Sequence, residues 1–324
     1  MAVGAMTTVL ALAGFTGSAL ATVSPPVAGK TFEATRVSGT VYVTQPHGSK
    51  TTLTGTEDVA VGSIFDVTKG SVQLTASNGK GGTYSGTFGA QKGAPSPQQF
   101  QALQSATGGA ITEIKLITAL GCTTKAADIS QRHRRYYRAI TVAAGQGFLV
   151  LGLSASASSK SGVSHYTLDD ECNGTHISDN GGKVLTKTKN GLTNTLIPGK
   201  SEISKCGAAS GGRSYCLFLI SDPSAITFTF GLGLINYAHA SHWTLCFTAP
   251  GSKKVCQNGP LAKAAGGTFQ GGGMTCTINY GPASFPARWL FKSRQVGPSE
   301  TFVATQPYRP FQAPGTSCTA YGAA

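Results

Sequence analysis

The segment from Val37 to Phe88 constrains the fold of this chain more than any other. It contains four short runs in which apolar and polar residues alternate, separated by glycine-containing turns: VSGTVYV, VAVGSIFDV, TKGSVQLTAS and GGTYSGTF. Such alternation over a few residues is typical of half-buried β-strands. The segment therefore predicts an all-β fold, with strands at 37–44, 59–67, 71–76 and 83–89.

The composition agrees with many short strands joined by turns. Of the 324 residues, 43 are glycine, 40% are hydrophobic and only 12% are charged, whereas about 25% of an ordinary globular chain is charged. Disordered chains are poor in apolar residues, so a folded protein is favoured. The length suggests two domains.

A hairpin is predicted around Asn190–Gly191, which separates the runs KVLTKTK and LTNTLI. Asn-Gly suits a two-residue type I′ turn because both central residues need positive φ. Such a turn would place Leu185 opposite Leu196 and Val184 opposite Ile197, so that apolar residues coincide in both pairs.

Other segments predict further elements. Two more strands are expected at 147–157 and 163–169, and ITEIKLITAL reads as another. In APSPQQFQALQSATGG a short helix is expected, with Ser96 as its cap, Pro97 in its first turn and Gly108 at its end.

The eight cysteines favour disulfides over zinc. Their number is even, no two form a C-x-x-C pair, and no histidine stands at zinc-finger spacing. The cysteines are Cys122, Cys172, Cys206, Cys216, Cys246, Cys256, Cys276 and Cys318.

Two pairings have a physical argument. A hairpin that sets Cys246 opposite Cys256 also sets Phe247 opposite Val255. A bridge between Cys122 and Cys172 would close a long loop and stabilise the protein by about 4 kcal/mol. The other four cysteines are ambiguous from sequence. Cys206 with Cys216 and Cys276 with Cys318 is the simplest division.

The N-terminus predicts export. Residues 1–21 form an apolar segment that ends in Ala19-Leu20-Ala21, which is a small-x-small cleavage pattern of a signal peptide. Cleavage near Ala21 would give a secreted or extracytoplasmic protein, whereas an uncleaved segment would be an anchor. No other run is long and apolar enough to cross a membrane. Residues 22–36, with Pro25-Pro26, read as a linker.

The formal net charge of +13 indicates either attraction to a polyanion or simply a secreted protein that is poor in acids. The basic residues are mostly scattered, which favours the second interpretation. The exception is one segment with interleaved tyrosines that could contact a polyanion, although a solvated loop explains it more simply. Its arginines are Arg132, Arg134, Arg135 and Arg138.

Residues 37–205 resemble the FecR domain. Val37, Gly39 and Val41 match the opening V-x-G-x-V strand of that family, and Gly70-Ser71-Val72 matches its G-x-V turn and strand. The later segment CNGTHISDNGGKVLTKT, followed by Pro198-Gly199-Lys200-Ser201, is similar to the second half of the domain. The stretch also resembles uncharacterised exported actinobacterial proteins that contain this domain.

The resemblance implies a β-solenoid-like or barrel-like extracytoplasmic domain that binds a protein or the envelope. The best-known FecR proteins are membrane-anchored regulators that act on a sigma factor. This chain lacks an internal membrane span and a cytoplasmic arm, which argues against that role here.

A domain boundary is predicted in the small, polar segment KCGAASGG, after residue 205. Residues 206–306 contain many short strands at close spacing, which favours an antiparallel β-sandwich of immunoglobulin-like type. Residues 307–324 read as a Pro/Gly-rich tail.

The sequence favours a non-catalytic interaction module at the cell envelope. It contains no nucleophile elbow, P-loop or dinucleotide fingerprint, and it indicates no cofactor and no metal. The expected partner is an envelope protein or an anionic cell-wall polymer, and no nucleic acid is expected. The alternatives are an anchored FecR-type sensor or anti-sigma regulator, and an envelope hydrolase. The hydrolase would use a cluster formed by His165, Asp169, Asp170 and Glu171.

Overall fold

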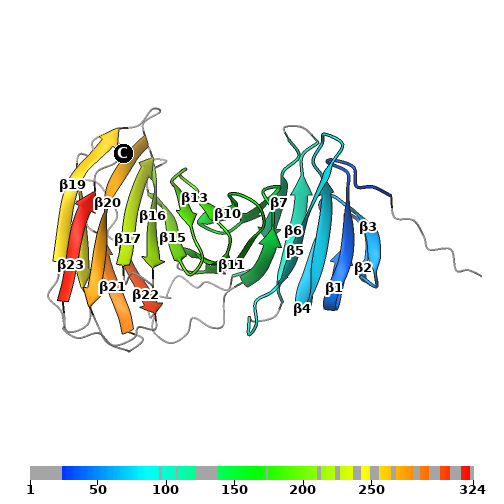
Figure 1. Ribbon diagram of the computed structural model, residues 1–324, viewed down its shortest axis with the longest axis horizontal. Coiled ribbons are helices and arrows are strands. Elements are labelled where there is room, and N and C mark those ends of the chain that lie inside the picture. The colour runs from blue at the N-terminus through cyan, green and yellow to red at the C-terminus, as the bar shows by residue number, and fades with distance from the viewer. Residues whose placement is uncertain are drawn as a thin grey trace, which may run out of the picture.

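The computed structural model describes residues 24–94, 97–106, 109–120, 138–172 and 174–209, and beyond these the backbone of the strands between 213 and 321. Every regular element in these residues is a β-strand, which confirms the all-β prediction. The strands follow one another along the long axis of the molecule, roughly in chain order (Figure 1).

Two layers of strands enclose the core of the N-terminal part. The first layer runs, in order of pairing, from β3 through β1, β4, β5, β8, β11 and β12 to β15. Its strands are β3 (Thr56–Ala60), β1 (Thr31–Thr44), β4 (Ile64–Ser77), β5 (Thr83–Ala90), β8 (Arg138–Ala144), β11 (Ser164–Glu171), β12 (Gly174–Gly181) and β15 (Ser201–Ala209).

The second layer shares β1 and β4 with the first. It runs from β2 through these two strands to β6, β7, β9, β10, β13 and β14. Its own strands are β2 (Lys50–Thr52), β6 (Gln99–Gln104), β7 (Thr112–Leu116), β9 (Phe148–Leu151), β10 (Ala155–Ser159), β13 (Val184–Thr188) and β14 (Thr193–Leu196). Among the strand pairs that the structure describes, only β7–β9 is parallel.

The layers join where β1 and β4 cross at a pair of glycines. Gly39 lies opposite Gly70, and the register of the two strands shifts on either side of the pair. A Cβ atom on Gly39, whose φ is +60°, would lie 2.0 Å from the Lys69 carbonyl oxygen, and one on Gly70 would lie 2.4 Å from the Ser38 oxygen. Only glycine allows this close approach. The sheet thereby folds back into a nearly closed, barrel-like form.

Aromatic side chains fill the space between the layers near this corner. Phe88 of the first layer contacts Phe100 and Phe148 of the second, with ring centroids 5.6 and 5.1 Å apart. Phe65 stacks on Phe100 at 5.2 Å. All four rings are fully buried, so apolar burial supplies most of the stabilisation in this part of the protein.

The predicted helix at 96–108 is wrong, because residues 99–104 form β6. The sequence QFQALQ alternates with a period of two, and Phe100, Ala102 and Gln104 are buried between the layers while the residues between them are partly exposed. A helix would have divided these three residues between different faces.

The predicted register of the Asn190–Gly191 hairpin is wrong by one residue. Val184 lies opposite Leu196, and both are fully buried. The loop has three residues rather than two: Thr188 N donates to Leu192 O at 2.9 Å, and Gly191 alone adopts positive φ, at +92°. In the predicted register Val184 would face Ile197, which is exposed.

The predicted segment boundaries do not coincide with breaks in the sheet. The linker predicted at 22–36 includes the start of β1, and the boundary predicted after residue 205 lies within β15. β15 pairs with β12 on one side and with β16 (Arg213–Asp222) on the other. The ion pair between Lys200 Nζ and Asp222 Oδ2, at 3.0 Å, also crosses that boundary.

The first layer continues into the C-terminal half. β16 is followed in pairing order by β17 (Thr227–Ile235), β20 (Thr268–Asn279) and β23 (Gly315–Tyr321). β23 lies within the predicted tail, which is therefore partly strand. A separate small sheet contains β18 (His242–Thr248), β21 (Phe285–Phe291) and β22 (Glu300–Gln306), and β19 (Val255–Lys263) pairs with both sheets.

Candidate functional site

The basic segment is described only at its end. Arg132, Arg134 and Arg135 lie outside the described residues. Arg138 begins β8, and its Nη2 lies 2.9 Å from Asp170 Oδ2. Its Nη1 also donates to the Thr118 carbonyl oxygen at 3.0 Å. The Arg138 guanidinium is thus engaged within the protein, and its side chain is only 15% exposed.

The cluster expected at His165–Glu171 is divided between the two faces of β11. Asp170 points into the core and is fully buried, whereas Asp169 and Glu171 lie on the outer face. His165 lies on that outer face four residues from Asp169, about 13 Å along the strand. Asp169 and Asp170 therefore do not point into one site.

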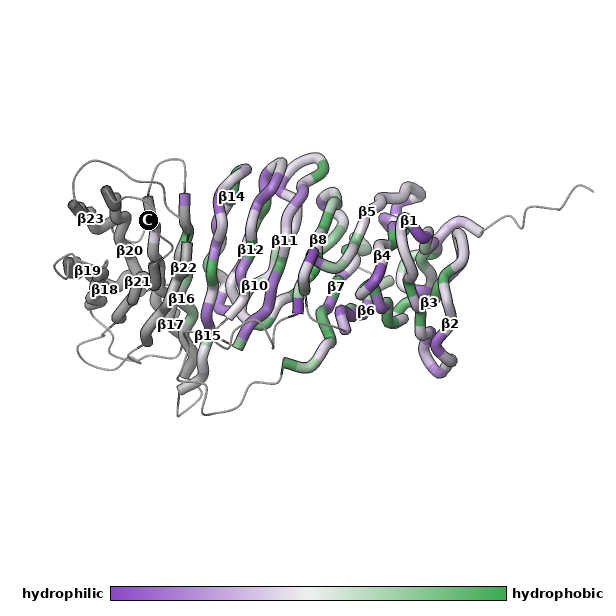
Figure 2. The backbone as a smooth tube through the Cα atoms, turned by 90° about the horizontal axis from the view of Figure 1, so that it is seen from below, coloured by the Kyte–Doolittle hydropathy of each residue, from purple (hydrophilic) through white to green (hydrophobic). Residues whose placement is uncertain are grey.

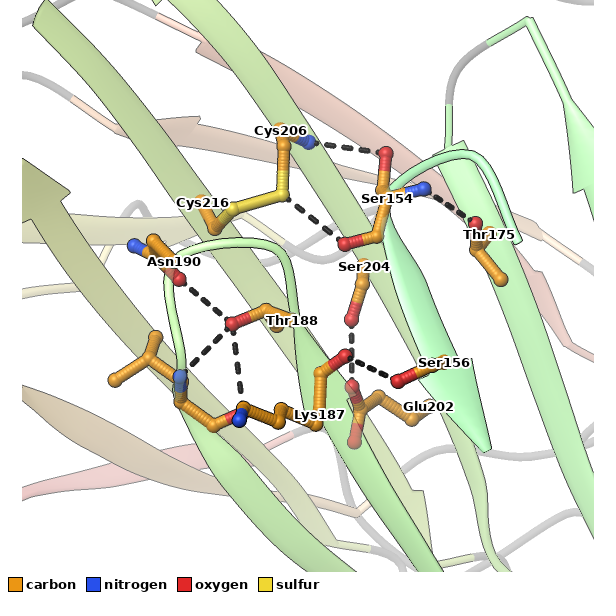
Figure 3. The surroundings of a disulfide bond; sticks show 11 residues. Ser154, Ser156, Thr175, Lys187, Thr188, Asn190, Glu202, Ser204, Cys206 and Cys216 are labelled. Atoms are coloured by element: carbon orange, nitrogen blue, oxygen red, sulfur yellow. Dashed lines mark hydrogen bonds between the residues drawn. A yellow bond between two sulfur atoms is a disulfide. The ribbon is translucent and has the colours of Figure 1, made fainter. Parts of the chain in front are cut away.

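Asp170 belongs to a structural network between the two layers. Its Oδ1 accepts hydrogen bonds from Leu153 N and from Thr175 Oγ1, both at 2.6 Å. Ser154 N donates to Thr175 Oγ1 at 2.8 Å, and Cys206 N donates to Ser154 Oγ at 3.1 Å. Figure 3 shows the part of this chain that reaches the disulfide. The network connects the end of the basic segment to the Cys206–Cys216 bridge.

A second buried carboxylate, that of Glu202, joins β15 to the strands of the other layer. Thr186 Oγ1 and Asn194 Nδ2 donate to its Oε2 at 2.5 and 3.1 Å, and Ser204 Oγ donates to its Oε1 at 2.5 Å. Burial raises the pKa of Glu202, and these hydrogen bonds partly offset that effect. The side chain is fully buried, so its role is to hold the layers together. Figure 2 shows hydrophilic stretches both in β15, the strand that carries Glu202, and in its neighbour β12.

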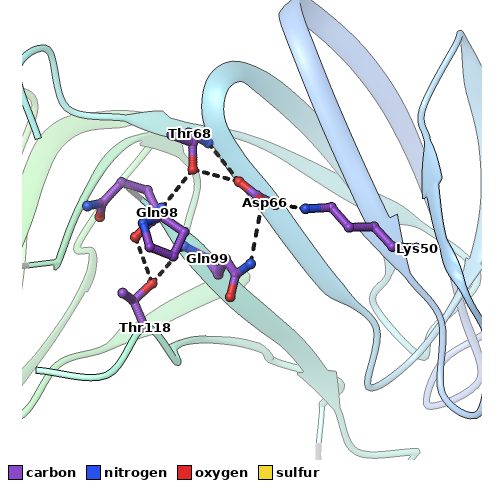
Figure 4. Close-up of polar contacts among 7 residues, drawn as sticks. Lys50, Asp66, Thr68, Gln98, Gln99 and Thr118 are labelled. Carbon is purple, nitrogen blue, oxygen red and sulfur yellow. Dashed lines mark hydrogen bonds and ion pairs between the residues drawn. The ribbon is translucent and has the colours of Figure 1, made fainter. Parts of the chain in front are cut away.

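Asp66, in the segment that resembles the FecR motif, is also structural. Lys50 Nζ and Thr68 Oγ1 contact this carboxylate at 2.8 and 2.6 Å, and Gln99 Nε2 lies 3.4 Å away (Figure 4). Desolvation raises the pKa of Asp66, but the hydrogen bonds outweigh it and hold the pKa below its usual value. The contacts connect β2, β4 and β6.

The disulfides agree with the pairings expected from sequence as far as they are described. Cys206 and Cys216 are bonded across the β15–β16 hairpin. Cys172 is disulfide-bonded as well, and its expected partner Cys122 lies outside the described residues. The backbone register sets Cys246 opposite Cys256, with Phe247 opposite Val255, and Cys276 opposite Cys318. The last two bonds remain predictions.

Replacing Cys206 and Cys216 together by serine should lower the free energy of unfolding by about 2–3 kcal/mol. The bridge closes a loop with a sequence separation of 10, and a loop of that size restricts the unfolded chain by about this amount. Urea unfolding followed by circular dichroism measures the change. Because the bridge should then be absent, adding dithiothreitol should lower the stability of the variant less than that of the parent. An equal loss in both proteins would contradict the assignment.

The outer face of the first layer carries acidic groups. Gln91, with its amide nitrogen toward the carboxylate, donates to Asp169 Oδ1 and Oδ2 at 2.6 and 3.1 Å. Burial, together with repulsion from Glu171 and Asp170, raises the pKa of Asp169 to about 7. His176 lies opposite Asp169 on β12, and burial lowers the pKa of His176 to about 4. Both groups are therefore less charged at neutral pH than exposed ones would be.

The outer face of the second layer carries lysines that the sequence reasoning missed. We define the basic face as the outward surface of β10, β13 and β14 with the adjoining turns. Its residues are Lys160, Lys183, Lys187, Lys189, Thr193 and Thr195, all exposed. The run KVLTKTK could have predicted part of this face, because strand alternation places Lys183 and Lys187 on one side of the strand. Lys160 joins them only through the pairing of β10 with β13.

In the part of the chain that the structure describes, no group of three or more His, Cys, Asp or Glu residues could hold a metal ion. The same residues contain no helix that is long and apolar enough to cross a bilayer. No family model, curated protein or solved structure matches this chain.

Proposed function

We propose that this protein is a secreted, non-catalytic binding module that acts at the cell envelope, where it binds a protein or an anionic envelope polymer. The observation that carries the proposal is the basic face, which presents lysine and threonine side chains on strands backed by a packed core. Because the strands already fix the backbone, only the side chains need to be ordered on binding, which lowers the entropic cost of recognition.

The charge distribution supports the binding role. The outer face of the first layer carries Asp169 and Glu171, and the basic face lies on the opposite side of the two-layer structure. The overall charge of +13 adds attraction toward anionic surfaces. The lysines of the basic face are therefore separated from Asp169 and Glu171, so that an anionic polymer can approach them without meeting those carboxylates.

Export and domain identity belong to the same proposal. A cleavable signal at residues 1–21 would bring the chain into an oxidising compartment, and the Cys206–Cys216 bond suits such a compartment. The FecR-like identity of the N-terminal part is supported by Gly39 and Gly70, since the motif glycines form the corner between the layers. An immunoglobulin-like arrangement of the C-terminal strands is supported by the small sheet of β18, β19, β21 and β22.

Mature protein beginning at Thr22 should sediment with isolated envelopes and be released by salt. If about three lysines displace counterions, the affinity should fall on the order of 30-fold between 50 and 200 mM salt. Co-sedimentation across a salt series measures this. Binding that does not respond to salt would indicate a specific protein partner instead. Absence of binding at every salt concentration would contradict the proposed function.

A further inference from the structure

We infer that the basic face binds an extended, hydroxyl-bearing anionic polymer, such as a polyol chain linked by phosphodiesters. This inference rests on the proposed function and specifies the surface and the ligand class. The first observation that supports it is that the lysines of the basic face form no ion pairs with carboxylates of the described residues. Among the described residues no carboxylate forms an ion pair with Lys160, Lys183, Lys187 or Lys189, whereas Lys50, Arg138 and Lys200 each have one.

The acidic side chains closest to the basic face point into the interior: Glu202 accepts hydrogen bonds from Thr186 and Asn194 and is fully buried, and Asp179 is buried as well. The outward-facing acidic side chains are farther away. Glu113 lies on β7, which is three strands away from β13 in the same layer, roughly 14 Å at ordinary strand spacing. Asp169 and Glu171 point outward from the other layer. Among the described residues, an anion on the outer side of β13 therefore meets lysines with no carboxylate on the same surface, which is the electrostatic complement of a polyanion.

The spacing of the lysines fits an extended ligand better than a compact one. Lys183 and Lys187 lie four residues apart on one strand, about 13 Å at the rise of a β-strand. Lys160 adjoins Lys183, because Lys160 N donates to the Lys183 carbonyl oxygen at 2.8 Å. A single small anion could contact only one end of this row, whereas a chain with repeated charges could contact both ends together.

Hydroxyl groups lie between the charged ends. Thr195 lies opposite Leu185, midway between Lys183 and Lys187, and Thr193 lies opposite Lys187. Thr195 Oγ1 accepts a hydrogen bond from Lys160 Nζ at 3.0 Å, which holds the ammonium group against the sheet. Hydroxyls can donate and accept hydrogen bonds, so this surface can pair with the hydroxyls of a polyol or sugar as well as with its phosphates.

A lipid bilayer fits this face less well. Leu185, at its centre, is only partly exposed and has lysines two residues away on each side of the strand. Membrane-surface binding usually adds a broad apolar face to the positive charge. We therefore commit to the polymer, and anionic vesicles serve as the competing ligand in the test.

The test compares three proteins by titration calorimetry with polyglycerol phosphate as the probe. The first is the mature parent, and the second carries Lys160→Ser, Lys183→Ser and Lys187→Ser. The matched control loses the same charge at exposed lysines on other surfaces, through Lys69→Ser, Lys80→Ser and Lys92→Ser. Because all six lysines are exposed, the three proteins should unfold at the same urea concentration.

The basic-face variant should bind the polymer on the order of 100-fold more weakly than the parent, at about fivefold per lysine, while the control variant stays within about threefold. Equal affinity of the basic-face variant and the parent would overturn the inference, although envelope binding by the parent would still support the proposed function. Binding no stronger than to uncharged dextran, or weaker than to phosphatidylglycerol vesicles, would overturn it too. Failure of the parent to bind envelopes at all would instead contradict the proposed function.

Discussion

Replacing Arg138 by methionine should lower the free energy of unfolding by about 3–5 kcal/mol. The Asp170 carboxylate is fully buried, and the Arg138 side chain that pairs with it is only 15% exposed. Removing the cation leaves a buried charge without compensation, which costs much more than the pair itself contributes. Urea unfolding of the variant and the parent, followed by circular dichroism, measures the difference.

Two controls separate the ion pair from other effects of the substitution. Lys50→Met removes the cation from the Asp66 pair, but Lys50 is 48% exposed, so the loss should be within about 1 kcal/mol. Adding Asp170→Asn to Arg138→Met should restore much of the stability, because the buried charge is then gone. If Arg138→Met alone cost no more than Lys50→Met, the network around Asp170 would be accessible to water and our description of it would be wrong.

Replacing Asp169 by asparagine should change how stability depends on pH. The folded protein raises the pKa of this carboxyl from 3.8 to about 7, so the folded state binds its proton more tightly than the unfolded state. The parent consequently loses stability as the pH rises from about 4 to about 7, and the asparagine variant lacks that loss. The free energy of unfolding of the variant minus that of the parent should rise by about 4 kcal/mol from pH 4 to pH 8.

Replacing His176 should change stability with the opposite pH dependence. Burial lowers the pKa of His176 from 6.5 to about 4, so the parent loses stability as the pH falls through that interval. The difference between His176→Gln and the parent should therefore rise toward low pH, by about 3 kcal/mol. Asp179 and Glu202, whose pKa values burial also raises, are common to all three proteins and cancel. If the stability differences of the two variants from the parent changed in the same direction with pH, the pKa shifts assigned to Asp169 and His176 would be wrong.

Local patterns in the sequence predicted the hairpins that close over a few residues. The Cys206–Cys216 bond matches the simplest division of four cysteines whose pairing was ambiguous from sequence. Phe247 lies opposite Val255, as expected, because a short turn leaves the two strands few registers. The same reasoning was wrong by one residue at Asn190–Gly191. There the burial of Val184 and Leu196 in a core shared with other strands selected a three-residue loop over the intrinsic preference of Asn-Gly for two.

The helix expected near Ser96 was wrong for a related reason. Helix-end signals such as Ser96 and Pro97 act on a few residues only. The alternation of QFQALQ instead places every second side chain between the two layers, which favours a strand. The surroundings of the candidate binding residues also depend on contacts between distant strands. Arg138 stands in a basic run, yet the fold brings it to Asp170, thirty-two residues away, and pairs it with that carboxylate. The charge of a segment does not reveal which of its side chains remain exposed.

By itself, the sequence determined the β character of the chain and the register of the Cys246–Cys256 hairpin, because these follow from alternation and turn residues that act within one segment. Only the tertiary structure decided which side of each strand faces the core, that β15 carries the sheet into the C-terminal half, and that Lys160 lies beside Lys183. Those outcomes depend on pairing between distant strands, and such pairing is selected by the packing of the whole interior.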